Sequence, residues 1–152
     1  MNRPATTGPA MSLNDPPAAE PGPATRRPRL LLVDDHDLGR KSLARLLEAM
    51  GFDVTDVVDG TTAFEMLGAA PKFDYVLTDV RLPDYDGREI VQVARQLVPK
   101  PRIALITGWD VEPDESRRLG IDWVFLKPLD VLDIVAKLQE APPTGRAIPP
   151  SP

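Results

Sequence analysis

Apolar residues in the middle of this chain gather in short runs, each closed by polar or turn-forming residues. The runs occupy residues 29–33, 54–58, 75–79, 103–106 and 123–126. Four to eight apolar or β-branched residues bounded by turn formers are typical of a buried β-strand. The pattern therefore predicts five strands, and two of them end abruptly in carboxylates, at Asp34 and at Asp79.

Between these runs, apolar residues recur three and four positions apart, which is the spacing of one face of an amphipathic helix. Four such stripes are formed by Leu43, Leu46, Leu47 and Met50; by Ala63, Met66, Leu67 and Ala70; by Ile90, Val91, Ala94 and Leu97; and by Val131, Ile134, Val135 and Leu138. A fifth helix, between residues 110 and 120, has a weaker pattern. Pro113 is tolerable in its first turn, and Leu119 is its only strong late anchor.

Strands that alternate with helices in this way indicate βα units around a parallel sheet. Right-handed crossover connections then place helices on both faces of that sheet. For five strands the common solution is the order 2-1-3-4-5, numbered along the chain. The sequence therefore predicts an α/β fold built on a five-stranded parallel sheet in this order.

The two ends of the chain have a different composition from its middle. Of the 18 prolines, seven lie in residues 1–28 and five in residues 141–152. Proline-rich segments without hydrophobic periodicity cannot bury enough apolar surface to fold. We therefore expect a disordered leader over residues 1–28, one domain over residues 29–140 and a disordered tail over residues 141–152.

Charge and composition narrow the possible partners and compartment. The tails hold four basic and two acidic residues, which leaves 14 basic and 21 acidic residues, or a net charge of −7, for residues 29–140. Such an acidic body argues against nucleic acid as a direct partner. The chain has no cysteine and no apolar run long enough for a membrane span. We therefore expect a soluble, cytoplasmic protein without disulfides.

The predicted strand order brings polar residues from separate strands to one edge, where ligands of open parallel sheets bind. The first and third strands are neighbours in this order, so Asp34 and Asp35 should lie near Asp79. Thr107 and Lys127, from the fourth and fifth strands, should lie on its other side. Crowded carboxylates repel one another unless a cation compensates. A hard divalent ion that prefers oxygen ligands, such as Mg²⁺, is therefore implied.

This set of residues fits phosphoryl transfer. Asp79, kept ionised beside Mg²⁺ and a lysine, can attack phosphorus as a carboxylate nucleophile and form an acyl phosphate. Lys127 and the Thr107 hydroxyl would neutralise the charge on the transferred oxygens. Taken alone, an Asp-Asp pair is more often a solvated turn or a helix cap, and a lysine after a strand more often lies on the surface. Their joint occurrence favours a site.

Four short motifs, each at the end of a predicted strand, resemble those of one protein family. They are Leu32-Val33-Asp34-Asp35, Thr78-Asp79-Val80-Arg81-Leu82-Pro83-Asp84, Thr107-Gly108 and Lys127-Pro128. In this order they resemble the receiver domain of bacterial two-component response regulators, and the resemblance covers residues 29–140. Each motif is weak alone, whereas the ordered set is highly specific. The fold implied by the resemblance is flavodoxin-like.

The resemblance also implies roles for individual residues. Asp79 would be the phosphoacceptor. Asp35, Asp79 and the main-chain carbonyl of Arg81 would bind Mg²⁺ directly, and Asp34 would bind it through water. Thr107 and Lys127 would contact the phosphoryl group, and a cis peptide bond would join Lys127 to Pro128.

Position 124 is one of three departures from the family pattern, beside a short spacing between Thr107 and Lys127 and a Thr-Gly-aromatic sequence that lacks the phenylalanines usual before its threonine. Receivers usually carry a tyrosine or phenylalanine three positions before the lysine, and this chain has Val124 there. The aromatic residues on either side, Trp123 and Phe125, face away from that position because a strand alternates its faces. We hypothesise that Trp109, which follows Thr107-Gly108, reports phosphorylation in place of the missing aromatic residue.

The resemblance predicts a single-domain response regulator that catalyses only its own phosphorylation and dephosphorylation. It would take a phosphoryl group from a histidine kinase or a histidine phosphotransfer protein, and then signal by contact with a protein target not identified by the sequence. Two alternatives stay open. A haloacid-dehalogenase-like phosphohydrolase would need a second aspartate where this chain has Arg81. A receiver-like scaffold that is not phosphorylated would have no need of the full acid, hydroxyl and lysine set.

Overall fold

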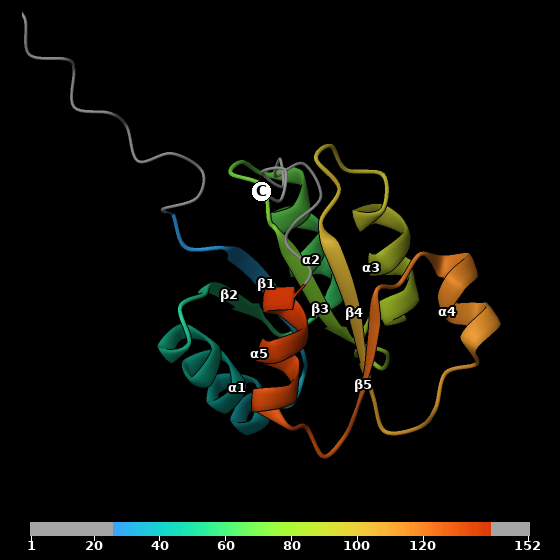
Figure 1. The fold of residues 1–152 in the computed structure, drawn as a ribbon. Helices are drawn as coiled ribbons and strands as arrows, with labels where there is room; N and C mark the ends of the chain where they lie inside the picture. The colour runs from blue at the N-terminus through green and yellow to red at the C-terminus, as the bar shows by residue number, and fades with distance from the viewer. Residues whose placement is uncertain (1–25, 141–152) are drawn as a thin grey trace, which may run out of the picture.

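The computed structural model describes residues 26–140, which form five strands and five helices in strict alternation (Figure 1). The strands are β1 (Arg29–Val33), β2 (Asp53–Val57), β3 (Tyr75–Asp79), β4 (Arg102–Thr107) and β5 (Trp123–Leu126). The helices are α1 (Asp37–Ala49), α2 (Gly60–Gly68), α3 (Gly87–Ala94), α4 (Pro113–Leu119) and α5 (Val131–Glu140). Every strand and helix expected from the sequence is therefore present.

All the strands are parallel and lie in one sheet of order β2-β1-β3-β4-β5, which confirms the predicted topology. Helices cover both faces of this sheet (Figure 1). α1 and α5 pack on one face, and α2 and α3 pack on the other. Side chains along β1 alternate between the two faces of the sheet. Leu30 and Leu32 pack in the first core cluster, under α1 and α5, and Leu31 and Val33 pack in the second, under α2 and α3.

The apolar stripe predicted for α1 is only half right. Leu43 and Leu47 are buried, but Leu46 and Met50 are 49% and 43% exposed. The buried face of the helix is instead Arg40, Leu43, Ala44 and Leu47, which keeps the helical spacing but starts with a charged residue. Hydrophobicity alone therefore placed the stripe three residues too far along the chain, because a buried arginine occupies the first position of the face.

The segment between residues 110 and 120 forms the predicted helix, and its weak apolar pattern agrees with its poor burial. α4 is the shortest helix of the described chain, and none of its residues is buried. Leu119 packs only partly against the second core cluster. No helix within residues 26–140 is long and apolar enough to cross a membrane.

The expected disordered leader and tail lie mostly outside the described residues. Arg26, which we assigned to the leader, is described, and its guanidinium donates two hydrogen bonds of 2.8 and 3.0 Å to the Asp74 carboxylate. The same carboxylate accepts a hydrogen bond from the backbone N–H of Arg29 at the start of β1. The domain contacts therefore begin a few residues before the first strand.

Candidate functional site

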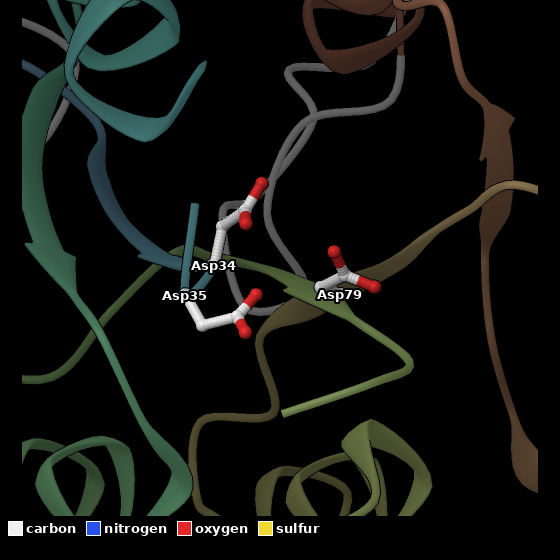
Figure 2. A group of neighbouring side chains, drawn as sticks. All are labelled: Asp34, Asp35 and Asp79. Atoms are coloured by element: carbon white, nitrogen blue, oxygen red, sulfur yellow. The ribbon is translucent and has the colours of Figure 1, made fainter. Parts of the chain in front are cut away.

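Three acidic side chains meet at the carboxyl edge of the sheet, as predicted. Asp34 and Asp35 follow β1, Asp79 is the last residue of β3, and the register pairs Val33 with Thr78. One carboxylate oxygen from each acid lies within 4.8 Å of the others. Figure 2 shows the three side chains grouped at the ends of these two strands. Asp34 and Asp79 are buried whereas Asp35 is exposed, so the group opens to solvent on one side.

The backbone around Asp34 is held by several hydrogen bonds. Its N–H donates to the Val57 carbonyl at the end of β2 (3.1 Å), and its carboxylate accepts from the N–H of His36 (2.9 Å). His36, the only histidine, caps the start of α1 by accepting a hydrogen bond from Gly39 on Nδ1. The partner of its ring is therefore the backbone of α1 and not one of the acids.

Arg40 is a residue of this region that sequence reasoning missed. It is 4% exposed, and its guanidinium donates to the Asp56 carboxylate (2.8 Å) and to the Asp34 main-chain carbonyl (3.0 Å). It also forms an ion pair of 2.8 Å with Asp37. Burial disfavours its charge, but the bonds to Asp56 and Asp37 outweigh that cost and raise the pKa of Arg40. Arg40 therefore ties the loop after β1 to β2 and α1.

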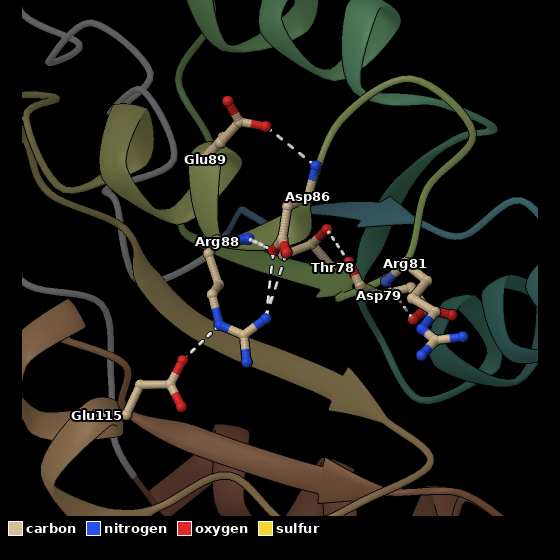
Figure 3. Close-up of polar contacts among 7 residues, drawn as sticks. All are labelled: Thr78, Asp79, Arg81, Asp86, Arg88, Glu89 and Glu115. Atoms are coloured by element: carbon tan, nitrogen blue, oxygen red, sulfur yellow. Dashed lines mark hydrogen bonds and ion pairs between the residues drawn. The ribbon is translucent and has the colours of Figure 1, made fainter.

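Asp79 is held on both of its carboxylate oxygens. Its Oδ1 accepts a hydrogen bond from the backbone N–H of Arg81 (3.1 Å), and its Oδ2 accepts one from the Lys127 ammonium (2.6 Å). The Thr78 hydroxyl donates to the Asp79 main-chain carbonyl (2.9 Å; Figure 3). A Cβ at Gly87 would lie 2.0 Å from that same carbonyl oxygen, so only glycine fits there.

Lys127 follows β5 and reaches across β4 to the acids. Its ammonium is 2.6 Å from Asp79 and 3.7 Å from Asp34. Partial burial disfavours its charge, but the hydrogen bond to Asp79 and the nearby charge of Asp34 outweigh this cost and raise the pKa of Lys127. The peptide bond to Pro128 is cis, as the resemblance predicted.

Thr107 closes β4 on the other side of Asp79. It is 1% exposed, and the sheet register pairs the preceding Ile106 with Asp79. Its hydroxyl oxygen accepts a hydrogen bond from the backbone N–H of Trp109 (3.2 Å), and its carbonyl accepts one from the N–H of Lys127 (2.8 Å). Thr107 therefore connects the loop that carries Trp109 to the strand end that carries Lys127.

Arg81 and Trp109 bring the loops after β3 and β4 together. The Arg81 guanidinium lies 4.3 Å from the centroid of the Trp109 ring, a cation–π contact at the rim of the site. Val124 packs with the second core cluster, whereas Trp123 and Phe125 pack with the first. The two aromatic residues therefore face away from the position of Val124, as their alternation along the strand predicted.

The donor set of this edge fits a hard divalent cation. Three carboxylates face one ammonium group, so acidic groups outnumber basic ones in the cluster. Carboxylate and carbonyl oxygens are the ligands that Mg²⁺ prefers, and Asp35 is accessible from solvent. The same edge offers a carboxylate nucleophile held between an amide N–H and a lysine, which is the equipment of a phosphoryl acceptor.

Comparison with known proteins agrees with this geometry. Residues 30–139 match the family described as the response regulator receiver domain. The chain is 32% identical over 115 residues to the response regulator receiver protein CpdR of Brucella abortus, in a match covering 74% of this chain and 94% of CpdR. It is 33% identical to the transcriptional regulatory protein QseB of Escherichia coli O157:H7, over 73% of this chain but only 51% of QseB.

Solved structures show the same fold. A CheY-like receiver domain from Methylobacillus flagellatus superposes with a TM-score of 0.68 at 27% identity, over 75% of this chain and 98% of that one. A response regulator from Burkholderia pseudomallei, solved with a phosphorylated aspartic acid, a calcium ion and citrate, gives a TM-score of 0.67 at 29% identity. That match covers 74% of this chain and 66% of the other.

Proposed function

Because the chain belongs to the response regulator receiver family, we propose that Asp79 accepts a phosphoryl group from a phosphohistidine with the help of Mg²⁺. The observation that carries this proposal is the placement of the Asp79 carboxylate, which bonds to Lys127 and clusters with the two acids that follow β1. The phosphohistidine would belong to a histidine kinase or a histidine phosphotransfer protein. The chain would catalyse only its own phosphorylation and dephosphorylation.

The proposed transfer balances without a further co-reactant. A carboxylate oxygen of Asp79 forms a bond to phosphorus while the bond from phosphorus to the imidazole nitrogen of the donor breaks, and the imidazole keeps the electron pair. The Lys127 ammonium, 2.6 Å from Asp79, is close enough to stabilise the negative charge on the transferred phosphoryl oxygens. The Thr107 hydroxyl would turn its proton toward the same group while its oxygen keeps the hydrogen bond from Trp109.

The proposed metal ligands are Asp35, Asp79 and the Arg81 carbonyl, with Asp34 bound through water. When bound, Mg²⁺ neutralises negative charge on the phosphoryl oxygens and on the acids. The clustering of the three acids supports this assignment. The Burkholderia pseudomallei relative, which was solved with a phosphorylated aspartic acid and a calcium ion, gives independent support for an acceptor and a cation in a receiver of this kind.

The surface beside the acids offers a docking place for the donor. A groove of about 460 Å³ runs between α1 and the loop after β5, and it starts at Asp34 and Lys127. Its apolar walls include Leu43, Leu46 and Leu129. Leu38, on the same helix, is 75% exposed. We therefore place the phosphohistidine donor against α1 and this loop, and a protein target would read the result by direct contact.

The hydrolase alternative finds no support in the geometry. Arg81 occupies the position where a haloacid-dehalogenase-like enzyme needs its second aspartate, and its guanidinium stacks on Trp109. The scaffold alternative gives no functional reason for the ion pair of 2.6 Å between Lys127 and Asp79. We therefore favour the phosphoacceptor over both.

Replacing Asp79 with Asn tests the proposal. The chain would be incubated with Mg²⁺ and phosphoramidate, a small donor with the same P–N bond as phosphohistidine, and the protein mass would be measured. We expect a single phosphoryl addition that base removes, and complete loss of this addition in the Asp79→Asn variant. The control is Asp59→Asn, which changes a carboxylate that caps α2 outside the site and should leave labelling intact.

Labelling of the Asp79→Asn protein to the wild-type level would refute the assignment of Asp79. Continuous turnover of p-nitrophenyl phosphate by the wild-type chain would instead favour the hydrolase alternative.

A further inference from the structure

The amino end of α2 is capped by two carboxylates. One directly precedes the helix in sequence, and the other comes from the loop after β3. Asp59 immediately precedes the helix and accepts a hydrogen bond from the N–H of Thr62 (2.8 Å). Asp84 comes from the loop after β3 and accepts from the N–H groups of Gly60 (2.8 Å) and Thr61 (2.9 Å). The first three N–H groups of the helix, which an isolated helix leaves unpaired, are therefore all bound.

Asp84 accepts a third hydrogen bond, and the next residue, Tyr85, also contacts α2. The Thr61 hydroxyl donates to the Asp84 carboxylate at 2.6 Å. The ring of Tyr85 packs edge-on against Phe64 of the same helix, with 4.9 Å between the ring centroids. A Cβ at Gly60 would lie 2.7 Å from the Tyr85 ring, so the loop approaches the helix as closely as glycine permits. We call these contacts of Asp84 and Tyr85 with α2 the α2 clip.

The loop held by the α2 clip carries the Arg81 carbonyl. At its other side this loop is fixed to the sheet, because the N–H of Val80 donates to the Ile106 carbonyl (3.1 Å) and the N–H of Gly87 donates to the Val80 carbonyl (2.7 Å). A β-bridge also pairs Arg81 with Asp86. Asp86 caps α3, and its carboxylate accepts a hydrogen bond from the N–H of Arg88 (Figure 3). The ends of the loop are therefore set by β4 and α3, and its tip is set by α2.

We propose that Asp84 is a positioning residue for the metal site, because its attachment to α2 holds the loop whose Arg81 carbonyl binds Mg²⁺. The inference rests on the proposed function, from which the carbonyl ligand comes. Only Leu82 and Pro83 lie between Arg81 and Asp84, so loss of the clip frees the tip of the loop and the peptide of Arg81 with it. A ligand that must be ordered when the metal arrives binds more weakly than one already in place.

The carboxylate of Asp84 suits this task because it stays charged. The Thr61 hydroxyl and the two helix N–H groups lower the pKa of Asp84 to about 2. The carboxylate is therefore ionised throughout the neutral range, and it faces the positive end of the α2 dipole. An asparagine at this position could accept one of the hydrogen bonds, but its NH₂ group would face helix N–H donors and could pair with none of them.

The test measures Mg²⁺ binding directly, by isothermal titration calorimetry on the full chain without any phosphoryl donor. Groups that orient metal ligands typically contribute about 10- to 100-fold in affinity, so we expect Asp84→Asn to raise the Kd for Mg²⁺ about tenfold. Asp59→Asn is the matched control, since it removes the charge of the other capping carboxylate at the same helix end without touching the loop. Its Kd should stay within about twofold of the wild-type value.

A milder variant keeps the test decisive if Asp84→Asn does not fold. Thr61→Val removes one hydrogen bond to the clip and keeps the carboxylate, so we expect about a threefold rise in Kd. A positioning role also predicts that saturating Mg²⁺ restores phosphoramidate labelling of Asp84→Asn. A defect that is merely structural would persist at any Mg²⁺ concentration.

The outcomes separate the two levels of the argument. Equal Kd values for Asp84→Asn, Asp59→Asn and the wild type would overturn the positioning role while leaving the metal site in place. Absence of Mg²⁺ binding by the wild-type chain would overturn the proposed function, and this inference with it.

Discussion

α1 and α4 follow strands that both contribute to the site, but they are attached to the sheet in different ways. α1 buries four residues, of which three join the first core cluster and the fourth, Arg40, bonds to Asp56 and Asp34. α4 has seven residues and buries none of them. The acids after β1 are therefore backed by a packed helix, whereas Thr107 and Trp109 lead into a helix that rests on the surface.

The contacts that hold α4 are mostly polar and lie near solvent. Glu115 pairs with Arg88 of α3, which also pairs with Asp86 at the start of that helix (Figure 3). Arg95, at the end of α3, donates to the Arg118 carbonyl at 3.0 Å. Half-exposed ion pairs contribute little to stability. This receiver therefore holds the acids after β1 firmly, whereas the contacts of α4 stabilise its position only weakly. α4 can be displaced more readily than α1.

Arg40→Met should give the largest effect in this comparison. The variant fills the space of the arginine stem but leaves the Asp34 carbonyl and the Asp56 carboxylate without their donor. We expect the free energy of unfolding to fall by about 2–3 kcal/mol, because the buried Asp34 carbonyl and the part-buried Asp56 carboxylate lose their donor. Urea denaturation measures it. Arg45→Met, on the exposed side of the same helix, is the control and should change stability by less than about 0.5 kcal/mol.

Glu115→Gln should have a smaller effect. It removes the charge that pairs with Arg88, and both side chains are 29% exposed, so we expect a loss of less than about 1 kcal/mol. Amide hydrogen exchange should nevertheless become faster within α4 and stay unchanged within α1, since local opening depends on local contacts. Glu112→Gln is the control, because that side chain makes no capping hydrogen bond at the start of α4. Equal protection of α4 in the wild type and in Glu115→Gln would contradict the comparison.

The smallest effect is spectroscopic and requires no change in stability. The Trp109 ring stacks on Arg81, and the backbone N–H of Trp109 donates to the Thr107 hydroxyl oxygen. A phosphoryl group that binds Thr107 should therefore alter the surroundings of the Trp109 indole. We expect tryptophan emission to change when Mg²⁺ and beryllium fluoride, a phosphoryl mimic, are added. Trp109→Phe should abolish this change. Persistence of the change in that variant would assign it to Trp123 and refute the hypothesis that Trp109 reports phosphorylation.

The fold could be predicted from the sequence because its signals are local. Runs such as that of β3 are apolar, short and bounded by turn formers, and connection rules leave few topologies for five such strands. The clustering of Asp34, Asp35 and Asp79 was predictable for the same reason. Each acid ends or follows a strand, and parallel strands deliver their carboxyl ends to one edge.

Arg40 and Asp84 show what local patterns miss. Arg40 reads as a solvated charge at the start of a helix, and only the packing of α1 against β2 makes it a buried donor. Asp84 reads as a turn residue in a loop, and only its approach to a helix 23 and 24 residues away makes it a cap. Their partners are distant in sequence, so no periodicity or spacing reveals them.

Sequence patterns were enough to predict the alternation of strands and helices, the strand order and the edge where the acids, the threonine and the lysine collect. They could do so because hydrophobic periodicity and chain connectivity act over short distances. Three features could be seen only in the folded chain: the face that α1 buries, the attachment of the loop after β3 to α2, and the position of α4 on the surface. These features depend on hydrogen bonds and packing between segments that meet only after the chain has folded.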